Sequence, residues 1–446
     1  MWPPRSAACW MIRSGGAKWG LRPAEGSRSN SASRTSCPCF SRCTSGFAPR
    51  AFRRMRICFI CNEYPPAPHG GVGTFVQGLA RRLARLGHAV AVVGWSAGAD
   101  LPEHACEDGV EVWRLKPPRY PALTLRLGRY EITPALLAER VLLSRRAATI
   151  ARDFGAQIVE SYDWSGPLWR APMRPLVVRM HGAHTAYEFY EGRRASRLLR
   201  FFERRNVAMA DALAAVSRSI GEITLRALGL NGTPFRVIYN GVETELFRPA
   251  PVERDPWEVL YVGSVTRRKG VPDLLAAFAL VAREAPQAHL TIVGRLPAPA
   301  NGANPVESWL RGLPESVRSR VVFTGPKPHA ELPAYYSRAA VAVFPSRAEA
   351  FGLTCAEAMA CGAAIVMTSL GSGPELVEDG SSGLLADPRK PEELAGAILR
   401  LLGDPALRKQ CSEAARRRVL EKFDAALLTQ ENLRFYRAVL EAHRGG

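Results

Sequence analysis

From Met55 onward the chain alternates short apolar runs with longer stretches of helical periodicity. The runs 56–61 and 89–93 enclose an amphipathic stretch, 73–86, in which apolar positions recur every three or four residues. Further short apolar runs follow at 110–114, 157–161, 176–180, 213–216 and 235–239. Strands that are separated by helices predict a parallel sheet covered on both faces.

The same alternation restarts after a Pro-rich polar stretch, 246–256, which is typical of a linker. We expect strands at 258–262, 288–293, 320–323, 341–344 and 363–366, and helices at 271–284, 330–338 and 354–360. A last helical run, 424–442, is expected to fold back on the first half. The pattern predicts an α/β protein with two doubly wound, Rossmann-like domains, 55–245 and 246–423, facing a central cleft at the carboxyl ends of their strands.

Composition fits an ordinary globular protein, because 47% of the 446 residues are hydrophobic and 23% are charged. No apolar run approaches the ~20 residues of a membrane-spanning helix, and the N-terminus lacks the apolar stretch of a secretory signal. We therefore expect a cytoplasmic protein.

The formal net charge of +19 is concentrated at the N-terminus, where residues 1–54 hold ten Arg or Lys against the single acid Glu25. This segment has no periodic apolar pattern, so we predict a disordered extension or a start codon assigned too early. A nucleic-acid-binding protein is one alternative, but it would rest on this segment alone. We predict no nucleic-acid partner.

The segment with most chemical information runs from Phe344 to Gly362. A strand ends at Phe344, a loop carries Glu349, and a helix begins near Thr354. Free backbone N–H groups at such a helix start favour a phosphate group. Glu357 has two readings: it flanks the bound ligand, or it closes a Thr354-x-x-Glu357 capping box. Spacing alone leaves both open.

This segment resembles the E-x7-E signature of glycosyltransferase family 4 (glycosyl transferases group 1), which are retaining enzymes of the two-domain GT-B fold. The resemblance implies that Glu349 holds hydroxyls of the donor sugar and that Glu357 bonds the ribose of the nucleotide. It also implies that the backbone around the residues between them binds sugar and diphosphate, namely Phe351, Gly352, Leu353 and Thr354.

The resemblance extends over most of residues 55–442. The stretch from Gly263 to Gly270 is similar to the loop that supplies an Arg and a Lys to the donor diphosphate, here Arg268 and Lys269. Many members have Gly-Arg where this chain has Gly263-Ser264, so Arg268 must carry that charge. The alternative is a group of surface cations at a helix start.

Five other segments resemble parts of the family near the donor. Gly71 and Gly73 lie where glycines let the backbone approach sugar and phosphate. His181 matches the histidine beside the donor sugar, and its position at the carboxyl end of a strand favours that role; the alternative is a purely structural histidine. Gly294 and Phe323 match the strand ends around the nucleotide base, and Glu375 reads as structural.

The resemblance implies a retaining hexosyltransferase that moves a hexose from a nucleotide-sugar, such as a UDP- or GDP-sugar, to a glycan or lipid-linked acceptor in polysaccharide biosynthesis. No Asp-x-Asp metal motif occurs, so we predict no metal site and no cofactor. A sugar-nucleotide epimerase or hydrolase on the same fold is the alternative. The basic helix expected over 193–205 suits either an anionic membrane surface, as a peripheral contact at its inner face, or the protein's own core.

Overall fold

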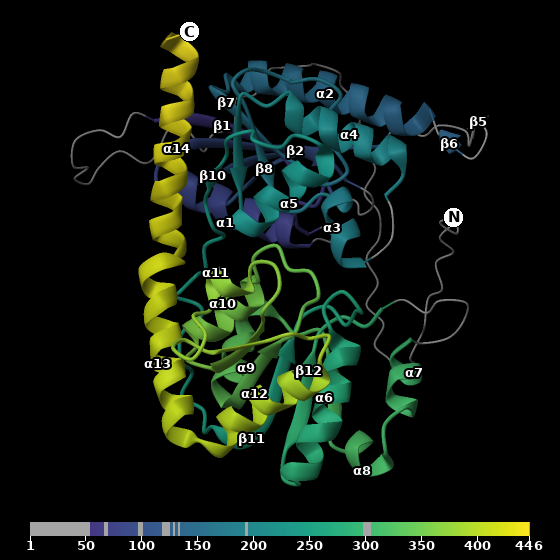
Figure 1. The fold of residues 1–446 in the computed structure, drawn as a ribbon. Coiled ribbons are helices and arrows are strands. Elements are labelled where there is room, and N and C mark those ends of the chain that lie inside the picture. The colour runs from purple at the N-terminus through teal and green to yellow at the C-terminus, as the bar shows by residue number, and fades with distance from the viewer. Residues whose placement is uncertain are drawn as a thin grey trace, which may run out of the picture. The chain divides into compact units, whose positions relative to one another are not determined.

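The computed structural model describes residues 54–66, 70–96, 101–117, 125–127, 130–132, 134–191, 195–297 and 305–445 (Figure 1). Apart from Arg54, the extension predicted over 1–54 lies outside these ranges. Within them, no helix is long and apolar enough to cross a membrane.

The N-terminal half holds an eight-stranded sheet in the order β10-β9-β8-β7-β1-β2-β4-β3. All neighbours are parallel except β3, which pairs antiparallel with β4 at one edge. The strands are β1 (Arg56–Ile60), β2 (Ala89–Trp95), β3 (His104–Glu107), β4 (Val110–Leu115), β7 (Ile158–Tyr162), β8 (Leu176–Met180), β9 (Ala212–Ala215) and β10 (Arg236–Val237). A separate antiparallel pair is formed by β5 (Leu125–Leu127) and β6 (Tyr130–Ile132).

Side chains that alternate along β1 pack into two different layers. Ile57 and Phe59 share a buried cluster with α1 (Gly71–Arg85) and α14 (Ala425–Gly445). Cys58 and Ile60 share another with helices of the opposite face, namely α2 (Pro134–Phe154), α4 (Arg197–Ala208) and α5 (Arg218–Leu228). The short α3 (His184–Glu191) contacts α4 and α5. Strands covered on both faces are mostly apolar, which explains the short apolar runs in the sequence.

The C-terminal half holds a six-stranded, fully parallel sheet in the order β13-β12-β11-β14-β15-β16. The strands are β11 (Asp255–Val262), β12 (His289–Val293), β13 (Val321–Gly325), β14 (Ala339–Phe344), β15 (Ala364–Thr368) and β16 (Leu384–Ala386). One face packs on α6 (Val271–Glu284), α7 (Pro305–Arg311), α8 (Glu315–Arg318) and α12 (Pro391–Gly403). The other packs on α9 (Leu332–Arg338), α10 (Leu353–Ala360) and α13 (Pro405–Lys422). The predicted α/β fold with two parallel sheets is confirmed.

Two predicted boundaries are wrong by a few residues. β11 begins at Asp255, inside the stretch expected to be a linker. The helix expected over 330–338 is a 3₁₀ turn, His329–Glu331, followed by α9. Pro333 lies in the first turn of α9, where its missing N–H costs no hydrogen bond.

The basic helix expected over 193–205 is α4, which begins after Ser196, whose side chain accepts the backbone N–H of Leu199 at 3.1 Å. Its Phe202 and Val207 are buried, whereas Phe201 is 49% exposed. The apolar stripe of α4 thus packs on the protein's own core, as the second reading of this helix expects.

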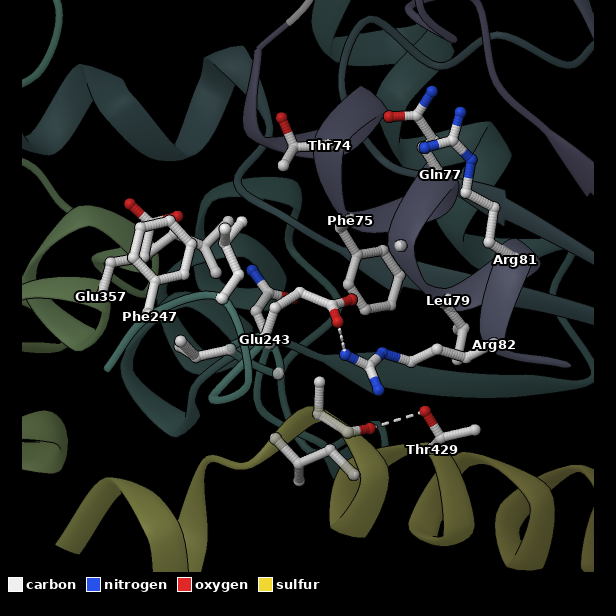
Figure 2. Close-up of a pocket in the computed structure, with 18 of the residues that line it drawn as sticks. Thr74, Phe75, Gln77, Leu79, Arg81, Arg82, Glu243, Phe247, Glu357 and Thr429 are labelled. Carbon is white, nitrogen blue, oxygen red and sulfur yellow. Dashed lines mark hydrogen bonds and ion pairs between the residues drawn. The ribbon is translucent and has the colours of Figure 1, made fainter. Parts of the chain in front are cut away.

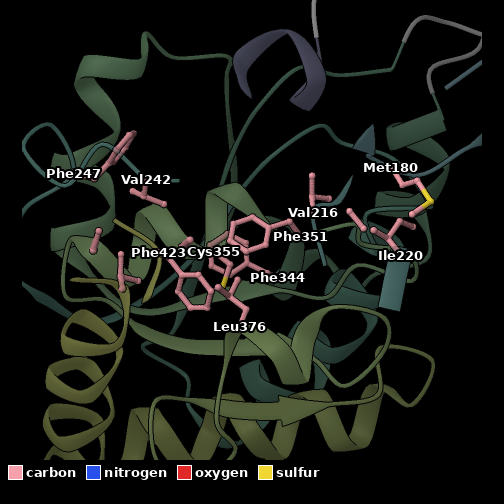
Figure 3. Packing of buried hydrophobic residues seen from close by; sticks show 14 of the residues in the cluster. Met180, Val216, Ile220, Val242, Phe247, Phe344, Phe351, Cys355, Leu376 and Phe423 are labelled. Carbon is pink, nitrogen blue, oxygen red and sulfur yellow. The ribbon is translucent and has the colours of Figure 1, made fainter. Parts of the chain in front are cut away.

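The core on the α10 side of the C-terminal sheet continues into the N-terminal half (Figure 3). Phe351 lies in its centre, with its ring 5.9 Å from that of Tyr239 and 5.6 Å from that of Phe423. The chain passes between the halves at Val242 and again near Phe423, and there the Val242 N–H donates to the Phe423 carbonyl at 2.8 Å. The two passages therefore lie side by side.

Candidate functional site

Glu349 lies in the turn between β14 and α10 and is almost buried. Its Oε2 accepts a hydrogen bond from Lys269 Nζ at 2.6 Å and another from the Ser346 hydroxyl at 2.9 Å. Burial acts to raise the pKa of Glu349, but the charge and hydrogen bond of Lys269, the Ser346 hydroxyl and the charge of Arg268 hold that pKa below its usual value. The turn therefore presents a carboxylate rather than a carboxylic acid.

The loop that carries Arg268 and Lys269 is clamped to the Glu349 turn. The Arg347 N–H donates to the Arg268 carbonyl at 2.9 Å, and the Arg347 guanidinium binds both oxygens of Asp273 in α6 at 2.7 and 2.6 Å. Gly270 has a φ of +72°, and a Cβ there would lie 1.8 Å from the Pro345 carbonyl oxygen. Only glycine lets the loop approach so closely, so these contacts place the predicted cations beside Glu349.

Arg268 extends toward the N-terminal half. Its guanidinium carbon lies 5.0 Å from the centre of the Tyr187 ring, which belongs to α3. Burial and the charge of Arg268 lower the pKa of the neighbouring His184 to about 4. The Arg268 side chain thus reaches from the C-terminal half to α3 of the N-terminal half.

The start of α10 decides between the two readings of Glu357. The N-cap is Gly352, with a φ of +99°, and no side chain caps this helix end. Thr354 lies inside the first turn, so it cannot cap the helix. The capping-box reading of Thr354 and Glu357 is therefore wrong. The N–H groups at the start of α10 point away from the helix, as the phosphate reading requires.

Glu357 instead bonds one side chain of the 3₁₀ turn His329–Glu331 and one of α9. Its Oε1 lies 3.0 Å from His329 Nε2, and its Oε2 accepts from the Tyr336 hydroxyl at 3.2 Å. The hydrogen bond with Glu357 raises the pKa of His329, although burial opposes this shift. His329 and Tyr336 were missed from the sequence, since they contact Glu357 only in the folded chain.

Glu357 also lines a cavity of about 290 Å³ between the two halves (Figure 2). Phe75 and Arg82 come to this cavity from α1, and Phe247 comes from the segment that follows the first passage. Arg82 points at Glu243 and forms an ion pair with it (Figure 2). Glu357 therefore faces a space that residues of both halves enclose.

His181 follows β8 and is buried. Its ring meets the edge of Phe75, with ring centres 5.1 Å apart. Burial, aided by the charge of Arg179, lowers the pKa of His181 to about 3, so its imidazole is neutral at physiological pH. The backbone N–H groups of His181 and Gly182 donate to the Asp163 carboxylate at 2.9 and 3.0 Å. Asp163 was missed, although its position after the apolar strand β7 was a usable signal.

The remaining predicted donor-binding residues, except Phe323, lie at strand ends and helix starts. Gly71 and Gly73 form the first turn of α1. Gly263 and Gly294 follow β11 and β12, and a Cβ on Gly294 would lie 1.8 Å from the Gly263 carbonyl oxygen. Phe323 lies within β13 and is half-buried.

Some of the predicted residues contact each other directly, and others are linked only through a residue that lies between them. Lys269 contacts Glu349, while His181 reaches the site through Phe75, which lines the same cavity as Glu357. The Phe351 side chain is in the core, so only its backbone is available to a ligand. Among the residues with described positions, no three His, Cys, Asp or Glu gather in a group that could hold a metal ion.

Comparison with known proteins identifies the family of the chain. The family described as "Glycosyltransferase Family 4" matches residues 69–246, and "Glycosyl transferases group 1" matches residues 242–418. The D-inositol 3-phosphate glycosyltransferase of Acidothermus cellulolyticus is 31% identical over 375 residues, covering 78% of this chain and 81% of that protein. The glycogen synthase of Mycobacterium tuberculosis is 29% identical over 415 residues, covering 87% and 96%.

Solved structures show the same fold. Sucrose-phosphate synthase from Thermosynechococcus elongatus superposes with a TM-score of 0.73 at 23% identity, covering 87% of this chain and 100% of that one. HepE of Anabaena in complex with UDP-glucose superposes with a TM-score of 0.68 at 19% identity, covering 86% and 100%. The chain belongs to glycosyltransferase family 4 and is a glycosyltransferase of the two-domain GT-B fold.

Proposed function

We propose that this glycosyltransferase moves a hexose from a nucleoside diphosphate sugar to a glycan or lipid-linked acceptor, with retention of the anomeric configuration and without a metal ion. The observation that carries the proposal is the 2.6 Å contact between Lys269 and Glu349 beside the start of α10. This contact supports the proposal because a carboxylate suits sugar hydroxyls, while a cation and the N–H groups of a helix start suit a diphosphate.

In this proposal the charges of the site meet the charges of the donor. Glu349 accepts hydrogen bonds from hydroxyls of the sugar. The diphosphate lies against the N–H groups of Leu353 and Thr354, where the dipole of α10 favours an anion. Arg268 and Lys269 stabilise the negative charge that grows on the departing nucleotide.

We propose that the acceptor attacks the anomeric carbon directly, on the face that the nucleotide leaves, because this single displacement retains the configuration without a covalent intermediate. No side chain then has to act as a nucleophile, so positioning and charge stabilisation carry the rate. The neutral imidazole of His181 can form a hydrogen bond with a sugar hydroxyl without adding charge to the site.

A UDP- or GDP-sugar is the proposed donor, and the UDP-glucose complex of HepE supports the first of these. A thermal-shift screen of nucleotide-sugars tests this choice, since a bound donor stabilises the fold by mass action. The anomeric configuration of the product, read by NMR, tests retention, and an inverted product would contradict it. Free sugar or an epimer formed with an acceptor present would instead favour the hydrolase or epimerase alternative.

Turnover should persist in EDTA, because cations of the chain are proposed to meet the diphosphate charge. Donor cleavage is measured in EDTA and again after Mg²⁺ or Mn²⁺ is added back. A rate that EDTA abolishes and the metal restores would contradict the proposed charge assignment.

Glu357→Gln should weaken binding of the bare nucleoside diphosphate by about 10- to 100-fold, the value of a lost hydrogen bond to a charged group. The ribose contacts exist in both ground and transition states, so kcat should fall less than affinity. Isothermal titration with UDP and GDP measures the effect.

Glu331→Gln is the matched control, since Glu331 lies in the same region and is exposed. Unchanged nucleotide affinity in Glu357→Gln, together with a lower melting temperature, would mean that Glu357 only holds His329 and Tyr336.

A further inference from the structure

The first turn of α5 is bonded by a carboxylate from the other half of the protein. Glu375, in the short helix α11 (Gly373–Leu376), accepts the backbone N–H groups of Arg218 and Ser219, both at 2.8 Å. The next N–H, that of Ile220, donates to the Ser217 side chain at 3.2 Å. These N–H groups have no partner within their helix, so Glu375 and Ser217 together satisfy the start of α5.

Ser217 also contacts the turn that carries Glu349. Its hydroxyl donates to the Ala350 carbonyl at 2.6 Å. The hydroxyl of Ser372 lies 3.2 Å from the Glu349 carbonyl and 3.1 Å from the Phe351 carbonyl. Three consecutive carbonyls of this turn are therefore held by two serines, one from each half.

Glu375 is itself firmly held in the C-terminal half. The Arg418 guanidinium donates to the Glu375 carbonyl at 2.9 Å and to the Leu376 carbonyl at 2.8 Å. The Glu375 N–H donates to the Ser372 carbonyl at 3.1 Å. The residue that holds α5 and the serine that holds the Glu349 turn thus belong to one turn of chain.

The N-terminal side of the contact leads to His181. The Val216 N–H donates to the Met180 carbonyl at 3.1 Å, which pairs the ends of β9 and β8. Ser217 follows Val216, and His181 follows Met180. A shift of α5 away from Glu375 would therefore move the strand end next to His181 relative to Glu349.

We propose that Glu375 is a positioning residue for glycosyl transfer. By bonding the first turn of α5 it keeps Ser217 on the Ala350 carbonyl, and so keeps the Glu349 turn and the His181 strand end in register across the two halves. The inference rests on the proposed function, since Glu349 and His181 matter here only as donor-binding groups.

Glu375→Gln is the direct test. Its amide has one oxygen acceptor, while its NH₂ group would face an N–H donor of α5. We expect kcat for donor cleavage to fall by about 10- to 100-fold, the range expected for a misplacement of about 1 Å. The affinity for bare UDP or GDP should stay within about twofold, because the nucleotide contacts with Glu357 and α10 lie in the C-terminal half.

Hydrogen exchange supplies a readout that does not depend on activity. The amides of Arg218 and Ser219 should exchange faster in Glu375→Gln than in the unchanged protein. Ser217→Ala should lower kcat by a similar factor. The kcat of the Ser217→Ala/Glu375→Gln double variant should be little lower than that of either single variant, because both substitutions break the same contact between the halves. Glu222→Gln is the matched control, since Glu222 is an exposed glutamate of α5 itself; its kcat should not change.

Faster exchange at α5 with an unchanged kcat would overturn the proposal, and so would unchanged exchange in Glu375→Gln. An equal loss of kcat and nucleotide affinity would show a general structural role instead. Failure of the unchanged protein to bind any nucleotide or cleave any donor would contradict the proposed function, while the exchange result would still report on the contact.

Discussion

Lys269→Ala is expected to lower kcat for donor cleavage by about 10²–10³-fold, the cost typical of one lost electrostatic donor in an active site. The diphosphate charge that Lys269 meets grows in the transition state, so kcat should fall more than nucleotide affinity. The same change leaves the Glu349 carboxylate without its 2.6 Å partner. Kinetics with the donor found by thermal shift, and titration of the bare nucleotide, measure the two effects.

Two control variants sharpen this result. Lys269→Arg keeps the charge but alters its geometry, and should recover part of the rate. Lys390→Ala removes an exposed lysine of the same half that pairs with Glu393, and should leave the rate unchanged. A Lys269→Ala enzyme with full kcat and weak nucleotide binding would mean that Lys269 serves ground-state binding alone.

Glu160→Gln should lower the free energy of unfolding by about 3–5 kcal/mol, because it leaves a buried charge without its counter-charge. Arg179 is fully buried and binds both oxygens of Glu160, at 2.7 and 3.0 Å. Asn432 and Tyr436 of α14 join this network, at 2.5 Å from Arg179 and 2.8 Å from Glu160. The substitution therefore also loosens α14 from the N-terminal sheet.

An exposed ion pair of the same interface is the control. Arg236 and Glu431 lie 3.1 Å apart, and Glu431 also comes from α14. Glu431→Gln should cost no more than about 1 kcal/mol, as is usual for exposed pairs. Denaturant unfolding of both variants measures the difference. An equal loss of unfolding free energy in the two variants would show that the buried ion pair stabilises the fold no more than the exposed one.

The pattern of apolar residues predicted the strands well where a strand is buried along its whole length. β14 and β15 are buried along their whole length, and their apolar runs marked them within two residues. The predicted start of β11 was wrong because pairing with β14 extends this strand back to Asp255, into a polar stretch. Pairing partners are chosen by tertiary contact, which periodicity does not report.

The candidate site shows the same division. The resemblance placed Lys269 and Glu349 in one site, and the structure brings their side chains into contact across 80 residues of sequence. The capping-box reading of Glu357 failed because spacing cannot tell which residue caps a helix. Gly352 takes that position with a positive φ, a conformation that glycine adopts without steric cost.

By itself the sequence predicted two parallel sheets, the helices α1, α4, α6, α9, α10 and α14, and the loops at the strand ends where Glu349, Lys269 and His181 lie. It did not predict α2, α5, α12, α13, β3 or β16. The predicted features follow from local periodicity and from short motifs, which are written in neighbouring residues. Only the tertiary structure decided that Asp163 holds the His181 backbone, that His329 and Tyr336 hold Glu357, and that Glu375 holds α5. Each of these partners is distant in sequence, and a hydrogen bond forms only where the packing of the sheets and helices brings a donor and an acceptor within about 3 Å.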